Sequence, residues 1–115
     1  MQKPTEEFFA RRGRANALLL ERANLSIKRF LALDRAVYKE GPATGAIPAK
    51  QKELLGLVAS TVLRCDDCIT YHLVRAHEEG ASRAEIEETL AIALVVGGSI
   101  TIPHLRAAFE LLERL

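Results

Sequence analysis

The chain has 115 residues, of which 49% are hydrophobic and only 5% are aromatic. A chain of this length usually forms one compact domain, so we expect residues 1–115 to be a single domain. Sixteen basic and fifteen acidic residues give a formal net charge of +1. This balance argues against a nucleic acid or an anionic membrane as a partner, because neither would be attracted electrostatically.

The composition predicts an all-α fold. Ala and Leu each occur 17 times, whereas Pro occurs only 4 times. Ala and Leu are strong helix formers, and strand-rich domains use more Val, Ile, Thr and aromatic residues. Breaks in the helical spacing of apolar residues divide the chain into six expected helices.

A short first helix is expected from residue 5 to about residue 15. A long second helix is expected to follow it and to end at about residue 39. The second contains four apolar residues at helical spacing, which predict a buried stripe: Ile27, Phe30, Leu33 and Val37. Residues 40–47 are rich in helix breakers and predict a loop.

Pro48 suits the first turn of a third helix, which is expected to run to about residue 63. Its apolar positions predict a second buried stripe: Leu54, Leu55, Val58 and Val62. A fourth helix is expected from near Cys65 to about Glu79, ended by Gly80.

Ser82 and Glu85 form a predicted capping box for the fifth helix. From Thr89 to Val96 that helix is apolar on all sides. A chain this short can bury such a helix only at its centre or against another subunit, and we expect a homo-oligomer. The sixth helix is expected to start near residues 102–103, with one apolar face: Leu105, Ala108, Phe109, Leu112 and Leu115.

The longest uncharged stretch, Thr89 to Leu105, is shorter than the roughly 20 apolar residues of a membrane span. Residues 1–7 include acidic residues where a signal peptide has a basic and then an apolar run, so we expect a cytoplasmic protein with reduced thiols. In that compartment two cysteines three positions apart indicate redox or metal chemistry.

Cys65, Cys68 and His72 are spaced i, i+3 and i+7, which places them on one face of the fourth helix. Cysteines one turn apart have Cα atoms about 5 to 6 Å apart, within the range for a disulfide. A thiol reacts as its thiolate, so a nearby base is needed, and His72 is the candidate.

Glu53 is a candidate partner for His72. If the third and fourth helices form an antiparallel hairpin that bends near Arg64, Glu53 lies opposite Arg75. His72 is then about 4.5 Å away along the helix axis, within reach of a glutamate. The spacing leaves two alternatives open: Glu53 orients His72, or it forms a salt bridge with Arg75.

A zinc site is a further alternative, since two cysteines and a histidine are three good ligands. It needs a fourth ligand, and neither His77 nor His104 is placed by its spacing to supply one. We expect His77 and His104 to be surface or packing residues. We therefore predict no metal and no other cofactor.

These residues resemble the signature of a known family. Glu53, Cys65, Cys68 and His72, preceded by Ile47-Pro48 and followed by Glu79-Gly80-Ala81-Ser82, are similar to the carboxymuconolactone decarboxylase superfamily, in particular its alkyl hydroperoxidase D-like branch. The resemblance spans about half of the chain. It implies an all-α domain with the Cys-x-x-Cys pair at the start of the fourth helix, assembled into trimers or hexamers.

The resemblance also implies a function. Members of that branch are antioxidant peroxidases that reduce hydroperoxides with a redox-active Cys pair, which a thiol reductant then recycles. Transferred to this chain, Cys68 is the peroxidatic cysteine, Cys65 the resolving cysteine, His72 the relay base and Glu53 its carboxylate partner. The alternatives are an oligomeric scaffold without efficient turnover, a lactone decarboxylase and a zinc-binding protein.

One position differs from the family pattern. The best-studied pattern in that branch has a histidine directly before the second cysteine, and Asp67 stands there in this chain. A carboxylate disfavours a nearby thiolate, so we expect a slow peroxidase that depends strongly on His72 and Glu53.

Overall fold

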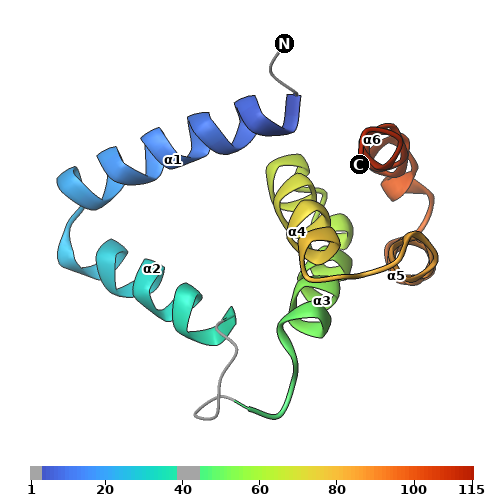
Figure 1. Cartoon of the computed structure of the whole chain (residues 1–115), viewed down its shortest axis with the longest axis horizontal. Coiled ribbons are helices and arrows are strands. Elements are labelled where there is room, and N and C mark those ends of the chain that lie inside the picture. Colours follow the sequence, from blue (N-terminus) through green and yellow to red (C-terminus); the bar gives the residue numbers. More distant parts are fainter. Residues whose placement is uncertain (1–3, 39–44) are drawn as a thin grey trace. The chain divides into compact units, whose positions relative to one another are not determined.

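The computed structural model describes residues 4–38 and 45–115 and is all-α in those parts (Figure 1). By its internal contacts the chain divides into two compact units, residues 1–39 and 40–115. The single domain expected from the chain length stays a prediction. The helices are α1 (Pro4–Arg22), α2 (Leu25–Tyr38), α3 (Ala49–Val62), α4 (Asp66–Glu78), α5 (Arg83–Gly97) and α6 (Ile102–Leu112), with a short 3₁₀ helix η1 (Ser99–Thr101) before α6.

The first unit consists of α1 and α2. Our prediction that the first helix ends near residue 15 is wrong, because α1 continues to Arg22. The break comes at Asn24, whose side-chain Oδ1 accepts the backbone N–H of Ile27 at 3.1 Å. Asparagine is a strong helix-capping residue, and this bond explains why α2 starts at Leu25.

The predicted buried stripe of α2 is not buried in the single chain. No residue of α2 is buried, and Phe30 is 68% exposed. The four residues do lie on a helix, but within the first unit α1 does not cover the face that they form. The predicted loop starts the second unit, and its residues 40–44 lie outside the described residues.

In the second unit α3 packs against both α4 and α5, and α6 contacts α4 and α5 (Figure 1). The helices α3, α4 and α5 and the 3₁₀ helix η1 each supply a fully buried side chain to one core. Leu57 comes from α3, Leu73 from α4, Ile86 and Leu90 from α5, and Thr101 from η1. The core of this unit therefore fixes α3 and α4 as neighbours, as the hairpin expectation requires.

Our prediction of the buried face of α3 is wrong. Leu55 is 58% exposed, and Leu54, Val58 and Val62 are only half-buried. The helix instead buries a mixed face: Ala49, Glu53, Gly56, Leu57, Ser60 and Thr61. Small and polar residues occupy this face because α4 and α5 both approach it, so apolar spacing alone does not identify it.

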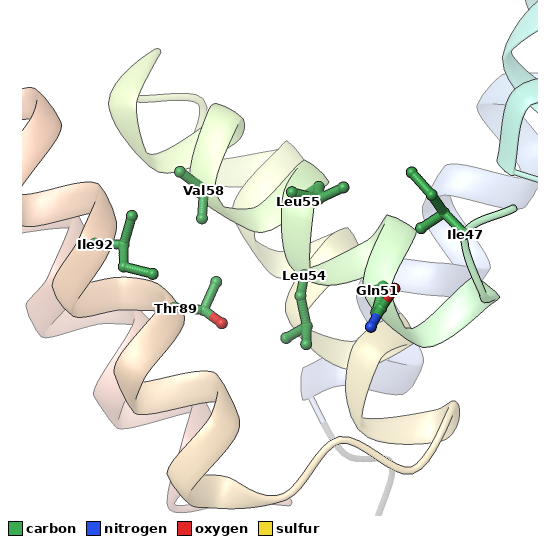
Figure 2. A pocket seen from close by; sticks show the side chains of 7 residues that line it. All are labelled: Ile47, Gln51, Leu54, Leu55, Val58, Thr89 and Ile92. Atoms are coloured by element: carbon green, nitrogen blue, oxygen red, sulfur yellow. The ribbon is translucent and has the colours of Figure 1, made fainter.

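Apolar residues beside this buried face of α3 line an open groove of about 250 Å³ against α5 (Figure 2). Leu54, Leu55 and Val58 face Thr89 and Ile92 across it. Of the predicted apolar stretch of α5, Thr89, Leu90 and Ala93 are buried, while Val95 is 84% exposed. One side of this helix is thus internal and the other is an apolar surface.

On α6 the predicted apolar face is correct in part. Ala108 and Leu112 are buried, as expected, but Phe109 and Leu115 are each 39% exposed. Leu111, which we did not predict, is buried with them. The face is rotated toward α4 and α5, the two helices that α6 contacts.

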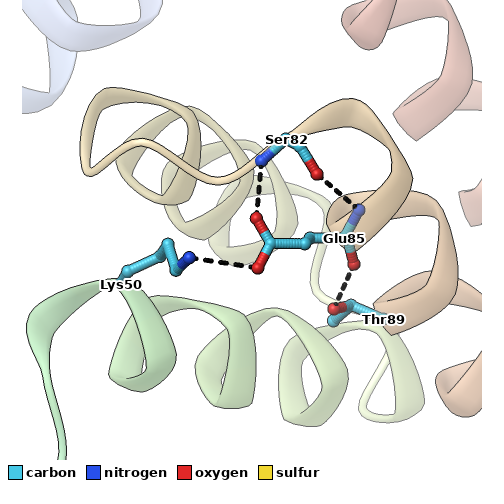
Figure 3. A network of polar contacts seen from close by, with 4 residues as sticks. All are labelled: Lys50, Ser82, Glu85 and Thr89. Carbon is cyan, nitrogen blue, oxygen red and sulfur yellow. Dashed lines mark hydrogen bonds and ion pairs between the residues drawn. The ribbon is translucent and has the colours of Figure 1, made fainter.

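The predicted capping box is present and does more than start α5 (Figure 3). Ser82 Oγ accepts the Glu85 N–H at 3.1 Å, and the Glu85 carboxylate accepts the Ser82 N–H at 2.9 Å. The same carboxylate accepts a hydrogen bond from Lys50 Nζ of α3 at 3.0 Å. The Ser82 backbone bond and then Lys50 hold the pKa of Glu85 below its usual value.

These bonds predict a loss of stability in acid. Because the pKa of Glu85 is lowered on folding, its contribution is present above the ordinary glutamate pKa and is lost as the pH falls through the lowered value. Unfolding by urea, followed by circular dichroism between about pH 6 and pH 3, should show a smaller acid loss in Glu85→Gln than in the parent. Glu88→Gln, at an exposed position of the same helix, is the control. Equal acid losses in the parent and Glu85→Gln would contradict this expectation.

Candidate active site

The turn between α3 and α4 places the first cysteine. Leu63 ends α3, and Arg64 adopts a left-handed conformation with φ 61°. The Arg64 N–H donates to Thr61 O and the Cys65 N–H donates to Ser60 O, each at 3.0 Å. These two bonds are those of a Schellman motif, which ends a helix and reverses the chain.

Cys65 is then the N-cap of α4. Its Sγ accepts the backbone N–H of Cys68 at 3.3 Å, in the way that a serine hydroxyl would. An N–H donor at a helix start stabilises negative charge, so the position favours a thiolate at Cys65. The fourth helix therefore begins at the cysteine pair, as we expected.

Cys65 and Cys68 form a disulfide, with Cα atoms 5.3 Å apart. Cys68 is exposed, whereas Cys65 is half-buried. The spacing prediction is confirmed, since the two sulfurs are within bonding reach in the folded chain. Cys68 is the more accessible of the two residues.

His72 lies one helical turn beyond Cys68 and is held by Glu53. Its Nδ1 is 2.8 Å from Glu53 Oε2, and the two side chains are only 13% and 6% exposed. An ionised carboxylate can only accept, so Nδ1–H is the donor and the lone pair of the neutral ring is on Nε2. Glu53 thereby fixes the tautomer that a general base needs.

The alternative partner of Glu53 is engaged elsewhere. Arg75 donates to Glu78 at 2.7 Å and lies 3.8 Å from Glu79. Partial burial lowers the pKa of Arg75, but the hydrogen bond and the charge of Glu78 outweigh it, so that the pKa is raised. Of the two pairings that the sequence left open, the structure has Glu53 with His72.

His104 makes a contact that the sequence analysis did not predict. Its ring is largely packed, in line with the expected surface or packing role, and its Nδ1 is 2.7 Å from Asp66 Oδ1, at the first residue of α4. The two residues are 38 positions apart, and only the packing of α6 against α4 brings them together. No spacing rule within one helix could have shown this contact. His77 is exposed, as expected.

Among residues 4–38 and 45–115, no group of three or more His, Cys, Asp or Glu side chains could hold a metal ion. In the same residues no helix is long and apolar enough to cross a membrane. The site consists of a cysteine pair, two carboxylate–imidazole pairs and Asp67.

Comparison with known proteins identifies the family of the chain. Residues 26–113 match the model of the carboxymuconolactone decarboxylase family. The chain therefore belongs to the carboxymuconolactone decarboxylase family.

Two curated relatives are similar to the chain. Protein 4 in the cox locus of Paracoccus denitrificans, described as uncharacterized, is 31% identical over 105 residues, which cover 89% of this chain and 91% of that protein. An uncharacterized protein of Cupriavidus necator is 34% identical over 64 residues, which cover 56% of this chain. The matched part spans 57% of the Cupriavidus protein.

Solved structures resemble the chain along nearly its whole length. The Thermotoga maritima protein TM1620 is 58% identical, with a TM-score of 0.89 over 95% of this chain and 92% of that one. A second structure of TM1620 describes it as a carboxymuconolactone decarboxylase family protein with a suggested involvement in the antioxidative response. The Legionella pneumophila family member lpg0406 is 27% identical, with a TM-score of 0.76 over 97% of this chain and 94% of that one.

Asp67, the departure from the expected motif, allows a test of charge at this site. It is exposed and lies between Asp66 and Cys68. We expect Asp67→Asn to raise the fraction of thiolate at Cys68, because a carboxylate beside a sulfur disfavours its ionised form. Alkylation of the reduced Cys65→Ser variant by iodoacetamide at pH 7 should become three- to tenfold faster, for an interaction of about 1 kcal/mol. An unchanged rate would show that the Asp67 carboxylate does not act on the sulfur.

Proposed function

We propose that the protein is a thiol-dependent peroxidase of the alkyl hydroperoxidase D-like kind, which works in the reducing cytoplasm on small hydroperoxides. The observation that carries the proposal is the hydrogen bond of Glu53 on α3 with His72 on α4, the helix that begins with a disulfide-forming cysteine pair. A largely buried imidazole of fixed tautomer, one turn beyond an exposed cysteine, is suited to take a proton from its thiol.

In the first step Cys68 is the nucleophile. His72 accepts the thiol proton at Nε2, directly or through a water, and Glu53 stabilises the imidazolium that results. The thiolate attacks the terminal oxygen of the hydroperoxide, and the O–O bond breaks. Cys68 becomes a sulfenic acid, and the alkoxide takes the proton and leaves as an alcohol.

In the second step Cys65 is the resolving cysteine. Its thiolate attacks the Cys68 sulfur, the S–O bond breaks, and the hydroxide leaves as water after taking a proton. The product is the Cys65–Cys68 disulfide. An external dithiol then returns two electrons and two protons by thiol–disulfide exchange, and the dithiol becomes a disulfide itself.

Two further observations support the proposed peroxidase function. The family membership fits the site, and TM1620, which is 58% identical, is connected by its description with an antioxidative response.

The alternative to a peroxidase is a family member with the same fold and a scaffold or binding role. Asp67 is the residue that favours this alternative, because its carboxylate disfavours the Cys68 thiolate and so slows peroxide reduction. A lactone decarboxylase does not require the cysteine pair that this chain has.

Hydroperoxide titration of the reduced protein tests the proposal. One equivalent of cumene hydroperoxide should remove two thiols per chain. Cys65→Ser should stop at a Cys68 sulfenic acid, which dimedone traps, or at an intermolecular disulfide. His72→Ala should slow the loss of thiols by about 100-fold or more, as expected for removal of a general base, and Glu53→Gln should also slow it.

His77→Ala, an exposed histidine on the same helix, should react like the parent. Reaction of Cys68→Ser as fast as the parent would show that the two cysteine roles are assigned wrongly. No loss of thiols in the parent would instead favour the scaffold alternative.

We also propose that the chain forms a homo-oligomer, a trimer or a hexamer, in which a second copy covers the apolar surface of α5. Ile92 is 51% exposed, Val95 84% and Val96 67%. Ile92 also borders the groove that Leu54 and Leu55 line, so the exposed apolar surface continues from α5 onto α3 (Figure 2). A continuous apolar surface of this kind marks a protein interface.

Sedimentation at micromolar concentration should therefore give a mass several times the 12.7 kDa of one chain. Val95→Glu should lower that mass, because a charge in a buried interface is costly to desolvate. Ala84→Glu, at an exposed position in the first turn of the same helix, should not change it. A parent that sediments as a single chain would contradict the proposal.

A further inference from the structure

The pair of His104 and Asp66 has no part in the reaction described so far. Its bond of 2.7 Å joins the first turn of α6 to the first residue of α4. The His104 side chain is 20% exposed and that of Asp66 is 69% exposed, so the ring is largely packed while the carboxylate is at the surface. An ionised carboxylate only accepts, so His104 Nδ1–H is the donor here as well.

The position of Asp66 relates this pair to the resolving cysteine. Asp66 follows Cys65 directly, and Cys65 Sγ already accepts the Cys68 N–H at the start of α4. That N–H favours a thiolate at Cys65, whereas the carboxylates of Asp66 and Asp67 oppose it. A donor bonded to Asp66 draws charge away from the sulfur and offsets part of this opposition.

We infer that His104 is a positioning residue for Cys65: it holds the Asp66 carboxylate and offsets its charge, so that the Cys65 thiolate forms more readily. The inference rests on the proposed function, in which that thiolate attacks the Cys68 sulfenic acid. His104 takes no part in the bond changes of that step and acts on Cys65 only through Asp66.

The two carboxylate–imidazole pairs thus have different tasks. Glu53 and His72 are both nearly buried, and the histidine is the member on the cysteine-bearing helix, so this pair moves a proton. In the other pair the carboxylate is on that helix and the histidine comes from α6. That arrangement sets the charge beside a sulfur and does not present a base to it.

We next consider which other charged groups could act on Asp66 or Cys65 at this end of α4. Arg64 is in the preceding turn and is exposed, and His72 is bonded to Glu53 of α3. On α5, which also contacts α4, the charged residues are all in its first half, which follows the opposite end of α4 in the chain, so none of them lies beside Cys65. Of these elements, α6 supplies the histidine bonded to the carboxylate beside Cys65.

A double-mutant cycle on thiol reactivity tests the inference. In the Cys68→Ser variant Cys65 is the single thiol, and its alkylation by iodoacetamide at pH 7 reports the thiolate fraction. His104→Ala should slow alkylation about two- to fivefold, and Asp66→Asn should accelerate it by a similar factor. In the Asp66→Asn background His104→Ala should change the rate by less than about 1.5-fold, since the charge on which it acts is gone.

His77→Ala is the matched control, an exposed histidine at the far end of α4, and should leave the rate unchanged. Thermal unfolding by circular dichroism checks that each variant folds. If His104→Ala does not fold, His104→Leu takes its place, because its side chain fills a similar space but has no donor for Asp66. It should slow alkylation by the same two- to fivefold factor, and an unchanged rate would count against the inference in the same way.

An unchanged rate in a folded His104→Ala variant would overturn the inference, and so would an equal slowing in the Asp66→Asn background. Alkylation needs no peroxide, so the result is separate from the proposed function. A positive cycle together with no consumption of peroxide would overturn the peroxidase proposal alone.

Discussion

The turn from Leu63 to Cys65 is the constraint on which the site depends. It ends α3 with two backbone hydrogen bonds, reverses the chain through the left-handed Arg64, and makes Cys65 the cap of the next helix. Because α3 and α4 then run side by side, Glu53 comes within 2.8 Å of a histidine 19 positions later in the chain. A shift of one residue in this turn would rotate α4 by about 100° and move His72 away from Glu53.

Because Glu53 is buried, its carboxylate needs a hydrogen-bond donor such as His72. Glu53 is 4% exposed, and a carboxylate removed from water is costly unless a donor compensates it. His72 supplies that donor. The hydrogen bond that compensates the buried carboxylate and holds α3 against α4 therefore also orients the imidazole. The structural role and the proposed catalytic role of Glu53 are thus consequences of the same hydrogen bond.

Charge at the start of α4 is finely balanced. The helix start and the Cys68 N–H favour negative charge on sulfur, while two consecutive aspartates oppose it. One of these carboxylates is bonded to His104, and for the other no hydrogen bond or ion pair is found within the described ranges. The alkyl hydroperoxidase D-like pattern that the chain resembles has a histidine in place of Asp67. In this chain a histidine reaches the same end of the helix from α6.

The sequence by itself determined the helical class, the start of α4 at the cysteine pair, the capping box of α5 and the candidate residues Glu53, Cys65, Cys68 and His72. These features depend on local spacing and on chain reversal at one turn, which are readable in the order of the residues. The membership of Glu53 in the site needed one further assumption, an antiparallel hairpin, which the packing of α3 on α4 fulfils.

Only the tertiary structure decided which faces are buried and which distant residues meet. The apolar stripe of α3 lines a groove while a face with Glu53, Ser60 and Thr61 is buried, because two helices pack against that face. The contact of His104 with Asp66 depends on where α6 crosses α4, and no local pattern encodes that position. Local sequence sets the period and the ends of a helix, but the choice among its faces is made by all of its neighbours together.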